Sequence, residues 1–236
     1  MNRLSVAVVT GGHKFHVRPF TDFFNSLDGV DPYIQHFDDW LSPSGVDDDP
    51  WFADTYGTSD LVHQEVRDSF DITLLYTLVR GPLEGAAKAS VERLIETGKP
   101  IFILHHALFN WREDARWGEI MGLSSERTLR QVDYGGPMNG IWFGEFPVKV
   151  NTDHPASAGL SDFEIDDETY ALPDCDEDCD VLLTTEHESS MRTLAWTRME
   201  GDSRIFCMQL GHDPKSWHNP AFRTLIQNGL KWCSDR

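Results

Sequence analysis

The fold of this chain is decided by the stretch Arg204-Ile-Phe-Cys-Met-Gln-Leu-Gly-His-Asp-Pro-Lys-Ser-Trp-His-Asn-Pro220. Its apolar run, Ile205 to Leu210, predicts a strand that is buried on both faces. The strand ends at Gly211, so His212 lies just beyond its tip. Asn219-Pro220 then begins a helix, because proline is favoured in the first helical turn. In open α/β sheets ligands bind beyond the carboxyl ends of the strands, so this tip is a candidate site.

Strands and helices alternate through the first half of the chain. Apolar runs predict strands at Leu4–Thr10, Tyr33–Phe37, Ile72–Leu78 and Ile101–Leu104. Helical spacing of apolar residues predicts helices at Pro19–Leu27, Leu83–Thr97 and Trp111–Met121. This alternation is typical of an α/β fold with a doubly wound, mostly parallel sheet and helices on both faces.

The second half of the chain changes to short strands separated by short turns. The candidate strands are Pro147–Val150, Phe163–Tyr170, Val181–Thr185 and Arg192–Met199, and the closing helix is Phe222–Trp232. Such strands predict antiparallel additions to the sheet. Because no repeat or linker interrupts the chain, residues 1–236 are predicted to form a single domain. The segment 38–58 is rich in Asp, Pro, Ser and Gly and is expected to cross the surface, anchored by Trp40, Trp51 and Phe52.

The amino-acid composition and the net charge limit the classes of molecule that this protein is expected to bind. The chain has 236 residues, of which 40% are hydrophobic and 25% charged, so it can bury a sizeable core. Its formal net charge is −19 and no basic stripe interrupts that acidity, so neither nucleic acid nor a membrane surface is an expected partner. No apolar run has the length of a membrane span, and the N-terminal residues predict a strand rather than a secretory signal. We therefore expect a cytoplasmic protein.

Histidines follow three of the predicted strands. His13 follows the first strand, His105-His106 the fourth and His212 the last. If these strands are parallel, their carboxyl ends meet at one edge and the histidines converge on one crevice. Histidine exchanges protons near neutral pH, and its neutral ring binds metal ions. The alternative for each histidine is a structural role in a solvated loop.

A carboxylate cluster, Asp166-Asp167-Glu168-Thr169-Tyr170, ends another candidate strand. Alternation along a strand places Asp167 and Glu168 on opposite faces, so at most one of them points into a given pocket. Glu168 is the candidate general base, or the oxygen ligand that completes a set of histidine metal ligands. The alternative is an acidic strand edge in an acidic protein.

The four cysteines match no complete metal motif. Cys175 and Cys179 lie in an acidic loop and leave open a local metal clip or a disulfide, whereas the other two lack the paired spacing of a zinc ribbon. Cys207 lies inside the last predicted strand and is expected in the core. The sequence also lacks a Walker loop, a dinucleotide-binding glycine fingerprint and a Gly-x-Ser-x-Gly elbow.

A set of short motifs, in order along nearly the whole chain, resembles the ThuA-like family, which is associated with trehalose utilisation and has a class I glutamine-amidotransferase-like fold. The matching pieces are Gly11-Gly12-His13, Ile103-Leu104-His105-His106-Ala107 with Trp111, Asp153-His154-Pro155 with Gly159-Leu160, Asp167-Glu168-Thr169-Tyr170, and Arg204 to His212 with Trp217, Pro220, Phe222, Leu225, Asn228-Gly229 and Trp232. The resemblance implies a flavodoxin-like α/β sandwich.

The resemblance also implies a pocket and a class of ligand. The pocket would be built from the loops that carry His13, His105, His106, Glu168 and His212, and the ligands would be sugars, notably disaccharides and their keto forms. A glutamine amidotransferase has a nucleophilic cysteine at the strand-to-helix elbow. His105-His106 occupies that place here, so glutamine hydrolysis by that route is not expected. The family's Gly-Gly-x-Phe piece is replaced by Gly122-Leu-Ser-Ser, and the insertion at 38–58 is particular to this chain.

Three functions are compatible with these residues. The first is an enzyme in which Glu168 or His106 is the base, while His13, His105 and His212 polarise a sugar carbonyl, and isomerisation, epimerisation or cleavage results. The second is a non-catalytic sugar-binding or sensing module that stacks sugars on tryptophans, namely Trp111, Trp142 and Trp217. The third is a metal-dependent hydrolase of another small substrate, with His13, His105, His212 and Glu168 as ligands.

Five residues are expected to contact the substrate: Trp111, Asp167, Tyr170, Trp217 and His218. The expected partner is a small-molecule sugar, and the one cofactor that the pattern suggests is a divalent metal ion. The apolar piece Pro50-Trp51-Phe52 is a candidate homodimer contact.

Overall fold

A computed structural model describes residues 3–41, 67–130, 140–151 and 153–235. Within these residues a nine-stranded sheet has the order β2-β1-β3-β4-β9-β8-β7-β5-β6. Its strands are β1 (Leu4–Gly11), β2 (Val30–His36), β3 (Ile72–Thr77), β4 (Ile101–Leu104), β5 (Ile141–Val150), β6 (Phe163–Tyr170), β7 (Asp180–Thr184), β8 (Thr193–Glu200) and β9 (Ser203–Met208). The strands share one continuous sheet, and the single-domain organisation of residues 1–236 stays a prediction.

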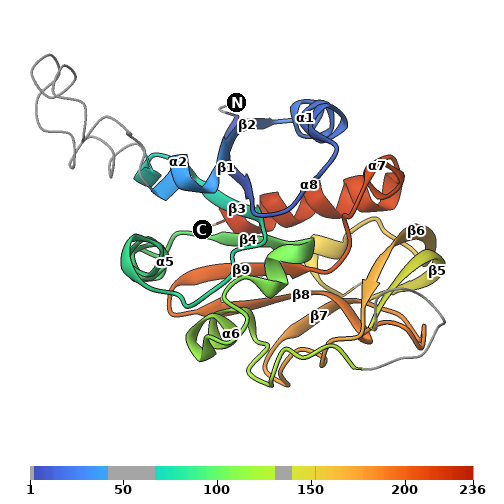
Figure 1. Cartoon of the computed structure of the whole chain (residues 1–236). Coiled ribbons are helices and arrows are strands. Elements are labelled where there is room, and N and C mark those ends of the chain that lie inside the picture. The colour runs from blue at the N-terminus through green and yellow to red at the C-terminus, as the bar shows by residue number, and fades with distance from the viewer. Residues whose placement is uncertain (1–2, 42–66, 131–139, 152, 236) are drawn as a thin grey trace, which may run out of the picture.

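Strand direction divides the sheet into two halves. The first five strands in the sheet order, β2 to β9, pair in parallel, so their carboxyl ends lie at one edge. Beyond β9 every neighbouring pair is antiparallel. The β5–β6 hairpin lies at the end of this antiparallel half, beside α7 (Pro214–Trp217) (Figure 1). The α/β fold with a parallel core and antiparallel additions is therefore confirmed.

Helices cover both faces of the sheet (Figure 1). One face is covered by α1 (Val17–Asn25), α7 and α8 (Pro220–Ser234), and the other by α2 (Phe37–Leu41), α5 (Gly85–Glu96) and α6 (Ala115–Met121). Two short 3₁₀ helices are η1 (His105–Phe109) and η2 (Pro155–Ser157). The inner strands β1, β3 and β4 are mostly apolar because both of their faces are covered, as β1 shows: Val6 and Val8 join the core with α1 and α8, whereas Ala7 and Val9 join the core with α5 and α6.

Two predicted elements differ most from the structure in where they begin. The helix expected at Trp111–Met121 begins only at Ala115, because Trp111 has a left-handed backbone (φ 43°) and the Asp114 side chain caps the helix by accepting the Trp117 backbone N–H. The strand expected from Pro147 begins at Ile141 instead. Its first eight residues pair with β6, and the apolar run that would have revealed the start of the strand is interrupted at Gly144.

The insertion at 38–58 does not begin as an irregular surface segment. Its first residues belong to α2, and the Trp40 side chain is buried in the core, as expected of an anchor. Trp51, Phe52 and the candidate dimer contact at Pro50-Trp51-Phe52 lie outside the described residues.

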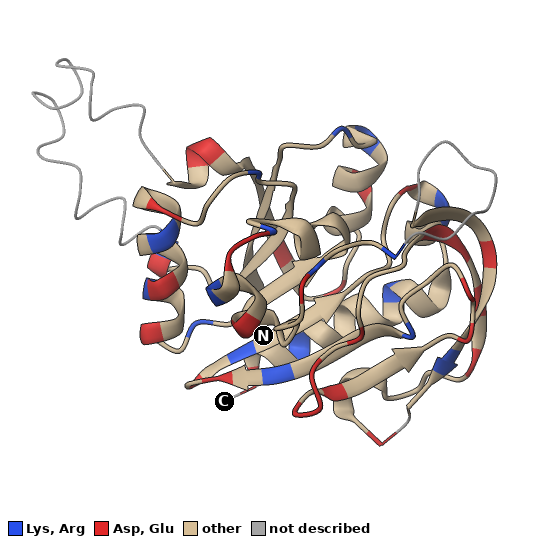
Figure 2. Cartoon of the chain, turned by 60° about the horizontal axis from the view of Figure 1, so that its bottom comes forward, with Lys and Arg blue, Asp and Glu red and all other residues tan. Residues whose placement is uncertain are grey.

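The surface shows acidic groups on several elements. Figure 2 shows Asp and Glu on helices, strands and loops, with Lys and Arg scattered singly between them in this view. None of the helices in the described ranges combines the length and the apolar character that crossing a membrane requires.

Candidate functional site

His105 occupies a sharp turn at the end of β4. The strand ends at Leu104 and η1 begins at His105, whose φ of 57° lies in the left-handed region. A side chain larger than glycine rarely adopts this conformation, and such strained positions cluster at functional sites. The turn carries the His105 side chain to the carboxyl edge of the sheet, where the loop after β9 places His212.

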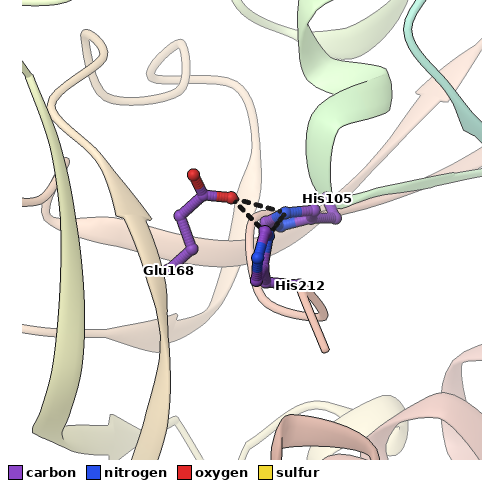
Figure 3. A group of neighbouring side chains, drawn as sticks. All are labelled: His105, Glu168 and His212. Carbon is purple, nitrogen blue, oxygen red and sulfur yellow. Dashed lines mark hydrogen bonds and ion pairs between the residues drawn. The ribbon is translucent and has the colours of Figure 1, made fainter. Parts of the chain in front are cut away.

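His105, Glu168 and His212 meet at this edge (Figure 3). The Glu168 Oε2 atom lies 3.0 Å from His105 Nε2 and 2.7 Å from His212 Nδ1, and the two nitrogens are 3.3 Å apart. The Tyr170 hydroxyl lies 2.7 Å from His105 Nε2 and 3.0 Å from Glu168 Oε2. We call these four residues the His–Glu–Tyr cluster. Its histidines come from the parallel half of the sheet and its other two residues from β6.

A backbone carbonyl fixes the tautomer of His105. The Nδ1 atom lies 2.6 Å from the carbonyl oxygen of Gln209, which can only accept a hydrogen bond, so we assign the proton to Nδ1. In a neutral ring the Nε2 lone pair then points toward Glu168 and Tyr170. The tyrosine hydroxyl can donate to it. The Nε2 atom is thereby held inside the cluster with almost no solvent contact, since His105 is 1% exposed.

Glu168 and His212 form a charged pair at the rim of the cluster. Burial opposes ionisation of Glu168, but the hydrogen bonds and charges of His105 and His212 outweigh it and lower the pKa of the carboxyl group. Burial likewise opposes a charge on His212, but the hydrogen bond and charge of Glu168 raise the pKa of the ring. The imidazolium and carboxylate forms therefore support each other. His212 is the more open member, with a side chain 26% exposed against 7% for Glu168.

Asp167 holds the loop that carries His212. Its buried carboxylate accepts the backbone N–H of Gly211 at 2.7 Å and that of His212 at 3.0 Å. Burial raises the pKa of Asp167, against the effect of these hydrogen bonds. Adjacent residues of β6 thus act on one loop from different sides: Glu168 contacts the ring of His212, and Asp167 contacts its backbone.

His106 and His13 form a second, inner pair. The His106 ring is 3% exposed, and neither of its nitrogens has a hydrogen-bond partner in the described part of the chain. It lies between the rings of His13 and Tyr76, at centroid distances of 4.7 Å and 4.3 Å. Burial lowers the pKa of His106 far below its usual range, so the ring is neutral. A buried imidazole with two unused nitrogens requires an explanation, such as a ligand group or a water molecule.

The comparison with family models gives one match. A model described as ThuA, trehalose utilisation, matches residues 49–233. The chain belongs to the ThuA family. No curated protein matches the chain.

Solved structures resemble the whole chain at low identity. A ThuA-like protein from Parabacteroides merdae has a TM-score of 0.69 and 16% identity, covering 98% of this chain and 90% of that one. A cytoplasmic protein from Salmonella typhimurium has a TM-score of 0.60 and 10% identity, covering 99% and 100%. A glutamine amidotransferase from Thermotoga maritima has a TM-score of 0.53 and 10% identity, covering 100% of both. These likenesses confirm the amidotransferase-like fold and nothing further.

In this member of the ThuA family, two tryptophans expected to contact the substrate are in the core. Trp111 is 1% exposed and packs edge-on against Trp117, with 4.9 Å between ring centroids. Trp217 is 3% exposed, and its Nε1 donates to the carbonyl oxygen of Gly211 at 2.9 Å. Through this hydrogen bond, Trp217 stabilises the loop that carries His212. Both tryptophans fill the core between loop and helix in this structure, and their contact with the substrate stays a prediction.

The other three residues expected to contact the substrate lie in three different environments. Tyr170 belongs to the His–Glu–Tyr cluster. Asp167 is satisfied by backbone N–H groups, so its carboxylate is not free for a ligand. His218 is exposed at the end of α7 and lines a different cavity, together with Pro19 and Phe23 around α1. His218 is therefore removed from the candidate site.

Two residues at the site were missed. Gln209 orients His105 through its carbonyl group, and its side chain accepts the Tyr170 backbone N–H at 3.0 Å. Phe143 on β5 pairs with Glu168 across the hairpin, and its ring is 51% exposed at a centroid distance of 5.2 Å from His212. Recognition of the hairpin register would have placed Phe143 beside Glu168. Nothing in the local sequence identifies the role of Gln209.

Three of the four suggested metal ligands come together. One donor atom from each of His105, Glu168 and His212 lies within 4.8 Å of the others, and in the described ranges no other such group occurs. The protonated Nδ1 of His105 leaves Nε2 as a ligand atom, which fits the pattern in which the second ring nitrogen of a metal-binding histidine is held by a carbonyl group. His13 is outside the group and contacts His106 instead.

The cysteine loop contributes nothing to this group. Cys175 and Cys179 are free thiols rather than a disulfide. A hydrogen bond from Cys179 lowers the pKa of the Cys175 thiol. Cys207 is fully buried in β9, in agreement with its expected place in the core.

Proposed function

We propose that this protein is an enzyme of carbohydrate metabolism that acts on a disaccharide or a keto-sugar by acid–base chemistry. The observation that carries the proposal is the His–Glu–Tyr cluster, a buried carboxylate held by two imidazoles and a phenol at the carboxyl edge of a parallel sheet. Membership of a family described as trehalose utilisation supports the substrate class. The products would be those of isomerisation, epimerisation or cleavage.

Each member of the cluster has a proton that it can give or accept. His212, protonated beside Glu168 and the most open of the four cluster residues, would donate to the carbonyl oxygen of a keto-sugar. The contacts to His105, His212 and Tyr170 are all made by Oε2 of Glu168, which leaves Oε1 outside them to accept a proton from the neighbouring carbon. His106, neutral and without a hydrogen-bond partner among the described residues, is the second candidate base. General acid–base groups of this kind contribute about 10²–10⁴-fold to a rate.

Phe143 would replace the buried tryptophans as the sugar-contacting ring. It is one of four large hydrophobic side chains exposed among the described residues, and it lies beside the open side of His212. An aromatic ring at such a place can cover the apolar face of a sugar. We therefore propose that a sugar stacks on Phe143 and not on Trp111 or Trp217. A sugar-binding module without catalysis would not need the proton-exchanging groups of the cluster.

A second candidate is a metal-dependent hydrolase, favoured by the three donor atoms of His105, Glu168 and His212. These residues would hold a divalent ion, which as a Lewis acid would polarise a carbonyl group or activate water. Metal content of the purified protein, compared with that of a His105→Ala and His212→Ala double variant, tests this candidate. Metal bound in stoichiometric amount to the first and lost from the second supports it. If no metal binds after Zn²⁺, Mn²⁺ and Mg²⁺ are added, the metal-dependent hydrolase is excluded.

Proton exchange tests the main proposal. The protein is incubated in D₂O with trehalose and with its 3-keto derivative, and both conversion and deuterium uptake beside the carbonyl group are followed by NMR. We expect exchange or turnover with the native chain and a loss of at least about a hundredfold in Glu168→Gln. His218→Ala is the matched control, because it removes an exposed histidine away from the cluster. Tight binding of the sugars without exchange or turnover would favour the binding module.

The cellular location stays a proposal. We propose that the protein is cytoplasmic, on the support of four free thiols, which suit a reducing compartment, and of its likeness to a cytoplasmic Salmonella protein.

A further inference from the structure

Arg80 is unusual among the arginines of this acidic protein. In the described part of the chain every other arginine contacts a carboxylate, a hydroxyl or a backbone carbonyl group: Arg3, Arg18, Arg67, Arg93, Arg112, Arg116, Arg127, Arg130, Arg192, Arg198, Arg204 and Arg223. Arg80 has no such contact with any described residue. With a net charge of −19, acidic side chains are abundant, so an exposed guanidinium that contacts none of them among the described residues is a distinct feature.

Arg80 lines a cavity of about 470 Å³, a size typical of small-molecule sites. The walls are apolar and consist of Leu78, Phe109, Leu129 and Ile141. Arg80 and Arg112 bring positive charge to it, and Glu113 is the one acidic residue among the described residues that line it. An apolar chamber with two guanidinium groups against one carboxylate is suited to an organic molecule that carries a negative charge.

Arg112 is held in place, unlike a free surface arginine. Its Nε donates to the carbonyl oxygen of Arg127 at 2.7 Å, which leaves its two terminal amino groups available. Arg127 is itself buried and donates to backbone carbonyl groups of the loop after η1, including those of Asn110 and Trp111. A buried cation thus fixes the loop that presents Arg112, which reduces the entropy lost when an anion binds.

The cavity borders the His–Glu–Tyr cluster. Phe109, a wall residue, packs edge-on against Tyr170 with 4.8 Å between ring centroids. Ile141, another wall residue, is the direct strand partner of Tyr170. The Tyr170 hydroxyl contacts His105 and Glu168, so Tyr170 lies between the cavity and the reacting groups.

We propose that this cavity binds an anionic substituent, a carboxylate or a phosphate, on the sugar whose other end reaches His212. The inference rests on the proposed function for the site of reaction, while the anion binding itself needs no turnover. It narrows the substrate class from sugars in general to sugar acids or sugar phosphates. Arg80 and Arg112 are the residues that would distinguish these from neutral sugars.

Paired ligands test the proposal by calorimetry. Trehalose 6-phosphate is compared with trehalose, and glucuronate with glucose, because each pair differs in the charged group. We expect at least one anionic ligand to bind roughly tenfold or more tightly than its neutral partner, since hydrogen bonds to a charged group are among the stronger ones. The preference should weaken as NaCl is added. The pair that shows it identifies phosphate or carboxylate as the group recognised.

Single variants assign the preference to the cavity. Arg80→Ala and Arg112→Ala should each reduce it, whereas Arg18→Ala, which removes the same charge from a side chain 93% exposed on α1, should leave it unchanged. Equal binding within both pairs, or a preference that survives in both cavity variants, would overturn the inference. Failure of the proposed function is a separate result, because it is measured as lost proton exchange in Glu168→Gln and not as a charge preference.

Discussion

The two halves of the sheet make different contributions to one site. The parallel half supplies His13, His105 and His212 at strand tips, where the topology brings the carboxyl ends together. The antiparallel half supplies acidic and aromatic groups from a hairpin that lies against those tips, namely Asp167, Glu168, Tyr170 and Phe143. A parallel sheet thus provides a place for chemistry, and the added hairpin determines which groups the histidines face.

Replacement of His212 should reduce turnover more than any other change, because it removes the most solvent-exposed contact between the parallel and the antiparallel half of the sheet. In His212→Ala, Glu168 loses its closest partner at 2.7 Å and the proposed proton donor is absent. We expect turnover of the sugar substrate to fall by about 10²–10⁴-fold. Steady-state rates by NMR, together with circular dichroism to verify folding, provide the measurement. Undiminished turnover in a folded variant would contradict the role of His212.

A substitution of Asp167 tests whether the β5–β6 hairpin also stabilises the loop that carries His212. Asp167→Asn places an amide where two backbone N–H groups need an acceptor, so at least one of them loses its partner. We expect a loss of about 1–3 kcal/mol in the free energy of unfolding, and a smaller fall in turnover than for His212→Ala. Urea denaturation measures the first quantity. Asp166→Asn, at the adjacent half-buried position, is the control; it removes only the charge of an ion pair with Lys215 at the surface and should cost less than about 1 kcal/mol.

The Glu168–His212 pair predicts a pH window for stability. The pKa of Glu168 is lowered from 4.5, so its contribution is present above that value and disappears as the pH falls through the lowered pKa. The pKa of His212 is raised from 6.5, so its contribution is present below that value and disappears as the pH rises through the raised pKa. The native chain should therefore exceed His212→Asn in stability most between pH 4.5 and 6.5.

Thermal unfolding of both proteins across pH 4 to 9, at about 0.1 M salt, would show this window. Turnover should decline with rising pH through the same His212 ionisation, since the proposed donor must be protonated. A difference between the two proteins that is constant with pH would show that the pair does not ionise as inferred.

Phe143 should produce the smallest effect, and mainly on binding. Phe143→Ala removes an exposed ring that contacts His212, so we expect KM to rise several-fold while kcat and the midpoint of thermal unfolding change little. Tyr33→Ala is matched in exposure, at 50% against 51%, and lies on β2 away from the hairpin. A rise in KM that is equal in both variants would remove Phe143 from the site. Phe143→Tyr should preserve the binding that depends on an aromatic ring.

The sequence also predicted more of the parallel half than of the antiparallel half. The bounds of β4 and the tip positions of His105 and His212 follow from unbroken apolar runs, a strictly local signal. The start of β5 was misplaced because its residues are ordered by pairing with β6, not by their own pattern. Trp111 and Trp217 were assigned to the substrate because sequence alone does not distinguish a tryptophan in a loop from one that the loop buries.

By itself, the sequence determined the strands, the order of polar tips and the family, because apolar periodicity and short motifs are carried by neighbouring residues. The tertiary structure decided which of the tip residues meet. Glu168 lies 63 positions from His105, and only the packing of the hairpin against the parallel edge sets their 3.0 Å contact. It also decided that His106 faces inward, with no hydrogen-bond partner in the described ranges, and that Phe143 is the exposed ring beside His212. These outcomes depend on long-range packing, which no local pattern contains.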